Sequence, residues 1–287
     1  MIYDLTTFES NVKSLSKYLS LAEIDIVDYI ERRKEDEIDI SEFLDDFNVS
    51  ENSLLKEPFF LTSLHVTTNM DSCDSIKKHG LMNLQKSVTL QTPLKEFLSN
   101  YNISIDIEQK KVIYNDEVID VSKKYDGIER HVGRKREGLD RVVWKLFQDY
   151  QINGFFYHEN PLNYGGYVNR RPEFLYDLGL LLGKDDLERE WDRDSKKQCY
   201  VVKFFAPISE FTNYTFDINS NVQDKREIEI MKRKWVVQRS LYHLLDKLNG
   251  YGVNECFSYL NFEVSIPPSN IMNIYTDKQY TEDFCLN

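Results

Sequence analysis

Residues 59–84 have the sequence FFLTSLHVTTNMDSCDSIKKHGLMNL, and this stretch decides the predicted fold. Its apolar run through Val66 predicts a strand that enters a core. Asp71 or Ser72 is suited to cap the next segment, and Gly80 is suited to end it in the left-handed conformation. The stretch therefore predicts a strand, a polar turn and a short helix closed by glycine.

Composition predicts a globular cytoplasmic chain. Of the 287 residues, 41% are hydrophobic and 13% aromatic. No apolar run approaches the roughly 20 residues that a membrane span needs, and residues 1–10 lack the parts of a signal peptide. The four cysteines form no C-x-x-C pair, which indicates neither zinc nor a disulfide framework. We expect reduced thiols, no bound metal and no membrane contact.

The net charge of −12 is distributed unevenly along the chain. Residues 1–57 contain 15 acidic and 6 basic residues, whereas residues 123–145 contain 8 basic and 4 acidic ones, and residues 225–239 contain 6 and 2. A protein that binds nucleic acid over its whole surface would be basic overall. This chain could bind DNA or RNA only through a local patch, such as residues 123–145, or could modify a protein instead. The alternative is that both basic windows are solvated helix faces.

The pattern along the chain predicts an α+β protein. Residues 1–57 predict an acidic helical segment, with a capping box at Thr6-x-x-Glu9, helices over 21–34 and 40–47, and no strand. Residues 58–287 predict a second domain. Its predicted helices cover residues 92–101, 139–150, 174–182 and 225–248. Its predicted strands are 60–66, a hairpin or three-strand meander in 103–121, 200–205, 255–266 and 271–275.

His65 lies where the predicted strand meets the polar turn. An imidazole there can hydrogen-bond a ligand hydroxyl without acting as a base, and Thr67 and Thr68 add hydroxyls at the same edge. The alternative is a histidine satisfied by local hydrogen bonds at a strand end.

Two tyrosines flank a pair of glycines in the stretch NYGGYVNRR. Glycine lets a backbone approach a ligand closely, and either Tyr164 or Tyr167 can stack on a flat, partly charged ring. Arg170 and Arg171 follow, with donors suited to ribose or phosphate. The alternative is a glycine turn whose tyrosines pack on the core.

His65-Val66-Thr67, followed by a helix and His79-Gly80-Leu81, resembles the opening of the ADP-ribosyltransferase fold. Poly-ADP-ribose polymerases and bacterial ADP-ribosylating toxins share this fold. The resemblance covers about residues 58–276 and implies a split mixed or antiparallel sheet with flanking helices. It implies NAD as a substrate and catalytic roles for His65 and Tyr164. The NAD contacts that it implies are His65, Val66, Thr67, Thr68, Gly80, Leu81, Tyr164, Tyr167 and Arg171.

The resemblance also implies a glutamate at the start of a late strand, where a carboxylate stabilises the oxocarbenium-like ribose as nicotinamide leaves. Two positions compete. Asn254-Glu255 precedes CFSYL, a form seen in many members, and we favour it. Glu263 lies in NFEVSIPP. If the strand over 255–266 is unbroken, alternation puts both glutamates on one face, so the spacing does not separate them.

The branch of the family and the acceptor stay open. Glu255 lacks the Glu-x-Glu pair of arginine-modifying members, so the resemblance favours the poly-ADP-ribose polymerase-like and the DNA- or RNA-modifying toxin branches. The first hypothesis is a mono-ADP-ribosyltransferase, a toxin or phage-defence effector that modifies nucleic acid or protein. The alternative is a fold relative that has lost catalysis and acts through a partner. In a third reading, acidic residues 1–57 restrain the enzyme or dock an antitoxin or chaperone. Candidates for contact with the pyrophosphate or a nucleic-acid backbone are Arg130, Arg134, Lys135, Arg136 and Arg141.

Overall fold

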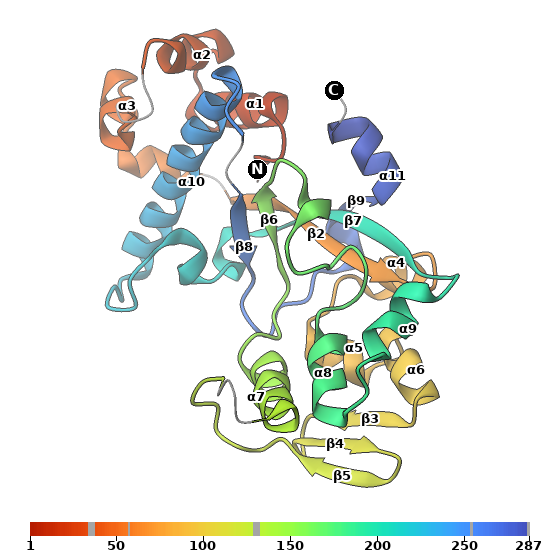
Figure 1. The fold of residues 1–287 in the computed structure, drawn as a ribbon. Helices are drawn as coiled ribbons and strands as arrows, with labels where there is room; N and C mark the ends of the chain where they lie inside the picture. Colours follow the sequence, from red (N-terminus) through yellow and green to blue (C-terminus); the bar gives the residue numbers. More distant parts are fainter. Residues whose placement is uncertain (34–37, 57, 129–132, 253–254, 286–287) are drawn as a thin grey trace. The chain divides into compact units, whose positions relative to one another are not determined.

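Segments far apart in the sequence come together in two units (Figure 1). The computed structural model describes residues 1–33, 38–56, 58–128, 133–252 and 255–285. The first unit comprises Met1–His65, Asn153–Pro161 and Lys203–Asn261. The second unit comprises Val66–Ile152, Leu162–Val202 and Phe262–Asn287.

The first unit contains the N-terminal helices, one long helix and most of a sheet. Its elements are β1 (Ile2–Tyr3), α1 (Phe8–Leu19), α2 (Glu23–Glu31), α3 (Ile40–Asp46), η2 (Glu51–Leu55), the start of β2 (Phe60–Asn69), β6 (Asn153–Tyr157), the end of β7 (Gln198–Pro207), η4 (Ile208–Glu210), η5 (Asn213–Phe216), α10 (Lys225–Leu248) and β8 (Cys256–Tyr259). The helices predicted over residues 21–34, 40–47 and 225–248 are confirmed as α2, α3 and α10.

The prediction that residues 1–57 contain no strand is wrong. Ile2 and Tyr3 form β1, which pairs in parallel with the start of β2. Tyr3 is fully buried, and its hydroxyl lies 2.7 Å from Oγ of Ser240 on α10. This two-residue strand is stabilised by contacts with residues distant in the sequence, so no local sequence pattern predicts it.

The N-terminal cap of α1 lies one residue later than predicted. The capping box pairs Thr7 with Ser10: Thr7 Oγ1 accepts from the Ser10 amide at 3.2 Å, and Ser10 Oγ accepts from the Thr7 amide at 3.1 Å. The predicted box of Thr6 and Glu9 does not form, because Thr6 donates both its amide and its hydroxyl to Asp4 Oδ1. The competing acceptor at Asp4 moves the helix start.

The basic window over residues 225–239 falls on α10, where its charges hold the unit together. Lys232 is buried and donates to the Phe211 carbonyl at 2.7 Å. Lys234 pairs with Glu51 of η2 at 2.9 Å. Basic side chains of α10 thus neutralise part of the negative charge of the N-terminal segment. This agrees with a structural role for the basic window 225–239.

Strands of the first unit follow the order β8-β6-β2-β7. β6 and β8 are antiparallel, with Gly154 opposite Ser258 and a bulge between Phe155 and Tyr157. Leu64 of β2 pairs with Phe155 of β6. A Cβ on Gly154 would lie 2.5 Å from the Leu64 carbonyl oxygen, so this crossing needs glycine.

The second unit combines helices with a three-stranded antiparallel meander. Its elements are the end of β2, α4 (Asp74–His79), α5 (Leu84–Thr89), α6 (Pro93–Asn100), β3 (Ile103–Asp106), β4 (Lys111–Tyr114), β5 (Glu117–Asp120), α7 (Arg134–Phe147), η3 (Pro161–Asn163, which begins in the first unit), α8 (Phe174–Leu182), α9 (Leu187–Arg193), the start of β7, η6 (Pro268–Asn270), β9 (Ile271–Thr276), α11 (Asp277–Tyr280) and the π-helical turn η7 (Thr281–Cys285). The predicted helices 92–101 and 174–182 and the meander in 103–121 are confirmed.

Helices α7 and α8 form the centre of the second unit's core. Val142, Val143 and Leu146 of α7 are buried in one cluster with Leu178 of α8. A Cβ on Gly138 of α7 would lie 2.3 Å from an α8 backbone nitrogen, so glycine permits the close approach of the two helices. This packing fixes the loop between β6 and α8, which carries the tyrosines and arginines noted in the sequence.

The α+β class with antiparallel sheets is confirmed, and the ADP-ribosyltransferase arrangement stays a prediction. The predicted boundary at residue 57 also stays a prediction, although α1, α2 and α3 belong to the same unit as α10, β6 and β8. In the part of the chain that the structure describes, no helix is both long and apolar enough to cross a bilayer.

Candidate functional site

An arginine-rich pocket of about 520 Å³ lies in the second unit. We call it the arginine pocket. It is formed by residues of α7, of the loop before α8, and of α8 and α9. Its lining residues are Arg141, Gly165, Gly166, Tyr167, Arg170, Arg171, Glu173, Tyr176, Asp177, Glu188, Arg189 and Asp192.

The loop that forms one wall of the arginine pocket turns at Tyr167. This residue has a φ of 54°, in the left-handed region, and its carbonyl accepts the amides of Arg170 and Arg171 at 2.9 and 3.2 Å. Tyr167 is 59% exposed, so one ring face is free to stack on a flat ligand. The Tyr164 ring packs against Gly166 and does not line the pocket.

Arg171 is buried and holds this loop in place. Its Nε donates to Glu188 at 2.6 Å, and one terminal nitrogen donates to the Gly166 carbonyl at 2.7 Å. The guanidinium also lies 5.9 Å from the centroid of the Tyr167 ring. Arg171 was predicted to bind NAD directly, but the geometry assigns much of its bonding capacity to positioning the pocket wall.

The charges of the arginine pocket are balanced. Four arginines face four carboxylates, and Arg170 donates twice to Asp192, at 3.0 and 2.6 Å. Burial raises the pKa of Asp177 to about 6, although Lys145 and Arg141 act in the opposite direction. The pocket therefore offers guanidinium donors and tyrosine faces without a large net charge, a combination that suits the phosphates and rings of a nucleotide.

His65 is half-buried in β2 and is bound to its own sheet. Its Nδ1 lies 2.7 Å from the Asn153 carbonyl oxygen of β6, and burial lowers its pKa. This local hydrogen bond matches the alternative interpretation of His65, in which the sheet itself satisfies the ring.

Glu255 lies immediately before β8 and is exposed. Its Oε2 is 3.3 Å from Nε2 of His158, the residue that follows β6. The His158 ring packs edge-on against Phe155, with centroids 4.8 Å apart, and burial lowers the His158 pKa while Glu255 raises it. Asn254, predicted with Glu255, lies outside the described residues.

The structure does not bring His65 and Glu255 together. One face of the sheet carries a row of paired residues across three strands, namely Leu64, Phe155 and Phe257. Successive side chains of a strand point to opposite faces, so His65, which follows Leu64, lies on the other face. Glu255 lies on the Phe155 face, through its contact with His158.

His158 is the partner that the sequence analysis missed. The register sets Tyr157 opposite Cys256, so His158 comes to face Glu255. The sequence contains a histidine directly after the apolar run FFY, and this could have marked His158 as a candidate. Its partner Glu255 could not be predicted, because that contact depends on which strand pairs with β6.

Glu263 has a different environment from Glu255. The strand region predicted over 255–266 contains the shorter strand β8, which ends at Tyr259, so the condition of an unbroken strand is not met. Glu263 accepts a hydrogen bond of 2.7 Å from the Tyr150 hydroxyl, and the Tyr150 ring stacks on Phe262. The two glutamates also belong to different units.

Two further predicted NAD contacts, Thr68 and Leu81, have hydrogen-bond partners in the second unit. Thr68 Oγ1 accepts from Trp191 Nε1 at 2.9 Å, and Val66 is buried. Leu81 exchanges two backbone hydrogen bonds with Ile266.

Gly80 ends α4 with a φ of 80° but a ψ of −170°, outside the left-handed helical region that was predicted. A Cβ there would lie 1.8 Å from the Ile266 carbonyl oxygen. Thr67, on the half-buried side of β2, forms a hydrogen bond of 3.5 Å to the Thr68 carbonyl.

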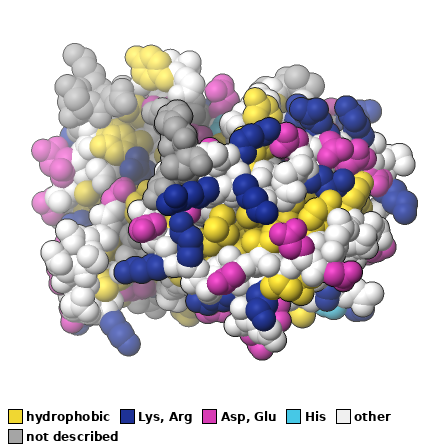
Figure 2. Space-filling view, turned by 60° about the horizontal axis from the view of Figure 1, so that its bottom comes forward, with side chains coloured by type: hydrophobic (Ala, Val, Ile, Leu, Met, Phe, Trp, Pro, Cys, Tyr) yellow, Lys and Arg dark blue, Asp and Glu magenta, His cyan; other side chains and the backbone are white. Residues whose placement is uncertain are grey.

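Most described basic side chains of the window 123–145 are ion-paired. The pairs are Lys123 with Asp140, Arg134 with Asp185 (2.7 Å), Lys135 with Glu117 (3.8 Å), Arg141 with Glu137 (2.9 Å) and Lys145 with Asp149 (2.6 Å). Figure 2 shows Lys and Arg side chains interspersed with Asp and Glu on the face that it presents. Arg130 lies outside the described residues. The nucleic-acid contact of this window stays a prediction.

No family model, curated protein or solved structure matches this chain. Among the described residues, no group of three or more His, Cys, Asp or Glu side chains is arranged to hold a metal ion.

Proposed function

We propose that the protein is an NAD-dependent mono-ADP-ribosyltransferase, a toxin or phage-defence effector, whose arginine pocket holds the dinucleotide. One observation supports this most: Tyr167, Arg141 and Arg171, assigned from the sequence to nicotinamide or phosphate, line the same pocket. A volume of about 520 Å³ falls in the range of small-molecule sites.

Within this proposal, Arg141, Arg170 and Arg189 bind the diphosphate, and an exposed tyrosine stacks on a ring of NAD. Tyr176, which is 41% exposed, offers a second aromatic face beside Tyr167. Arg171 is a positioning residue, since its contacts with Glu188 and Gly166 hold the loop. Tyr164 has no place in the pocket wall, so the stacking role falls to Tyr167.

Cleavage of the nicotinamide–ribose bond needs a carboxylate close to the sugar as positive charge develops. The resemblance, rather than the arginine pocket, is the ground on which we assign this role to Glu255, which belongs to the first unit whereas the pocket belongs to the second. Glu255 is exposed, it precedes a strand as the resemblance implies, and its contact with His158 fixes its orientation. Glu263 is the less suitable candidate, because it already accepts a short hydrogen bond from Tyr150.

The test incubates the full chain with labelled NAD and separate pools of DNA, RNA, protein or buffer alone. We expect nicotinamide release and label transfer to one pool. Glu255→Gln removes the charge but keeps the shape, and should lower the rate about 100-fold or more. Glu263→Gln is the matched control and should leave the rate within a few-fold. Tyr167→Ala should weaken NAD binding by one stacking contact.

Two results would count against this function. If the chain neither binds NAD nor releases nicotinamide with any pool, the enzyme proposal fails. If Glu263→Gln abolishes turnover while Glu255→Gln does not, NAD chemistry stands but the glutamate is misassigned.

The second candidate is a protein without catalysis that acts through a partner. It is favoured by the exposed carboxylates on the N-terminal helices, such as Asp39, Glu42 and Asp46, which no described ion pair fully neutralises. Toxicity in cells that survives the double change Glu255→Ala and Glu263→Ala would select this candidate over the enzyme.

A further inference from the structure

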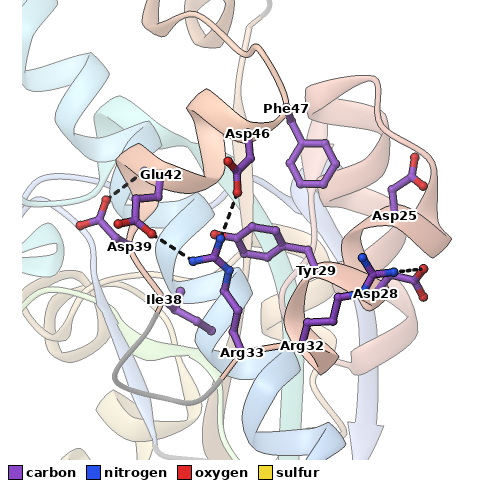
Figure 3. A pocket seen from close by; sticks show the side chains of 10 residues that line it. All are labelled: Asp25, Asp28, Tyr29, Arg32, Arg33, Ile38, Asp39, Glu42, Asp46 and Phe47. Carbon is purple, nitrogen blue, oxygen red and sulfur yellow. Dashed lines mark hydrogen bonds and ion pairs between the residues drawn. The ribbon is translucent and has the colours of Figure 1, made fainter.

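Helices α2 and α3 of the first unit enclose a pocket that the proposed reaction does not use (Figure 3). We call it the acidic pocket, and its volume is about 800 Å³. Five carboxylates line it: Asp25, Asp28, Asp39, Glu42 and Asp46. Two guanidinium groups also line it, so the described lining has three negative charges in excess.

The wall of the acidic pocket contains a buried hydroxyl that is unsatisfied. Tyr29 is 9% exposed, and its ring packs against Phe43 and Phe47 at centroid distances of 4.9 and 5.7 Å. Figure 3 shows the ring extending from α2 toward Arg33 and Asp46. Among the described residues, the Tyr29 hydroxyl has no hydrogen-bond partner. Leaving such a group unpaired costs about 1–3 kcal/mol, so a ligand that bonds to it is favoured.

Arg33 shows which chemistry the acidic pocket accommodates. Its guanidinium carbon lies 4.3 Å from the centroid of the Tyr29 ring. Its two terminal nitrogens donate to Glu42 and Asp46, at 3.0 Å each. A cation over an aromatic ring and between two carboxylates is a favourable arrangement.

Arg33 leaves the other acidic groups of the pocket available. Asp28 pairs with Arg32 at 3.2 Å, an exposed pair that contributes little. Asp39 caps α3 with one carboxylate oxygen, which accepts hydrogen bonds from the amides of Ser41 and Glu42. Asp25 is exposed at the start of α2. Negative charge thus remains on both helices.

We propose that the acidic pocket binds a flexible polycation, a chain that carries several ammonium or guanidinium groups, with the Tyr29 hydroxyl accepting a hydrogen bond from one of them. Spaced charges on an aliphatic chain can reach the carboxylates of α2 and of α3 together. A free polyamine and a lysine- or arginine-rich segment of a partner protein share this chemistry. The proposal is independent of NAD turnover.

The test measures binding of spermidine, and separately of a hexa-arginine peptide, to the full chain by titration calorimetry at low salt. Tyr29→Phe should weaken binding about fivefold to tenfold, the effect of one lost hydrogen bond of ordinary net strength. It should not lower thermal stability, because the hydroxyl is unsatisfied without ligand. Asp25→Asn should weaken binding by a similar factor, whereas Asp45→Asn should not. Asp45 lies on α3 and carries the same charge but does not line the pocket.

Each outcome decides the proposal. Binding of spermidine alone supports it with a free polyamine as ligand, and binding of the peptide supports it with a partner segment. The proposal is overturned if neither probe binds, or if Tyr29→Phe and Asp25→Asn bind as tightly as the unchanged chain. The proposal is also overturned if Mg²⁺ displaces spermidine as effectively as a second polyamine does at equal ionic strength. The pocket would then select its ligand by charge alone, without a preference for a flexible chain.

Discussion

The acidic pocket and the arginine pocket contain similar residue types but manage their charges in opposite ways. In the acidic pocket, five carboxylates meet two arginines, and the carboxylates of Glu42 and Asp46 remain more than half exposed. In the arginine pocket, four arginines meet four carboxylates, and the buried Arg171 pairs with the half-buried Glu188. One pocket keeps an excess of charge at the surface, whereas the other cancels its charges by close pairing.

This difference shows that net charge does not predict the sign of a site. A chain with a net charge of −12 places an arginine-rich pocket in one unit and an acidic pocket in the other. Pairing determines what each pocket can attract, because a paired charge is largely cancelled whereas an exposed excess acts at a distance.

The largest expected effect compares the central arginine of each pocket. Arg171→Ala leaves Glu188 and the Gly166 carbonyl without a donor in a site where the arginine side chain is 10% exposed, and should lower the free energy of unfolding by about 3 kcal/mol. Arg33→Ala, with the side chain 25% exposed and exposed partners, should cost about 1 kcal/mol. Urea unfolding followed by circular dichroism measures both. Equal losses in the free energy of unfolding would show that the central arginine contributes equally to stability in both pockets, and would contradict the comparison.

A second prediction concerns pH and the buried carboxyl of the arginine pocket. The pKa of Asp177 is about 6 in the folded chain, against an ordinary value of 3.8, so the folded state binds the proton more tightly. The stabilisation is complete below pH 3.8 and is lost as pH rises through 6. The loss amounts to at most about 3 kcal/mol. Asp177→Asn should remove this dependence. Unfolding of the unchanged chain and of the variant between pH 4 and 7 will reveal it as a difference in stability that widens as pH rises.

Asp177 also links pH to binding in the arginine pocket. Protonation removes one negative charge from the lining, so NAD should bind more tightly at pH 5 than at pH 8. Titration of the full chain with NAD at both pH values tests this link, and tighter binding at pH 8 would contradict it.

The smallest expected effect is outside both pockets. Arg134→Ala breaks an exposed pair with Asp185 and should change the free energy of unfolding by less than about 1 kcal/mol, with NAD affinity unchanged. The measurement matters for the nucleic-acid hypothesis. If Arg134→Ala strongly reduces labelling of DNA or RNA, the basic window 123–145 contributes to acceptor binding despite its ion pairs.

Local patterns predicted most of the helices. The helices predicted over residues 92–101 and 174–182 appear as α6 and α8. These elements follow from capping and turn chemistry, which act over a few residues. The cap of α1 was misplaced by one residue because Asp4, outside the recognised box, captured Thr6.

The candidate sites were harder to predict, because their partners are distant along the chain. NYGGYVNRR indicated a loop suited to a ligand, but α7 and α9 supply Arg141 and Glu188, which complete the arginine pocket. The Glu255 prediction missed His158, since that contact depends on the register between β6 and β8.

The sequence by itself determined the α+β class, the positions of most helices, the acidic N-terminal segment and the loop with exposed tyrosine and arginine. Tertiary structure alone decided which charges are cancelled, which face of the sheet His65 occupies, and which glutamate acquires a histidine partner. The physical reason is range: caps, turns and periodicity are set by neighbours within a few residues, whereas burial, ion pairing and strand register are set by groups that only folding brings close.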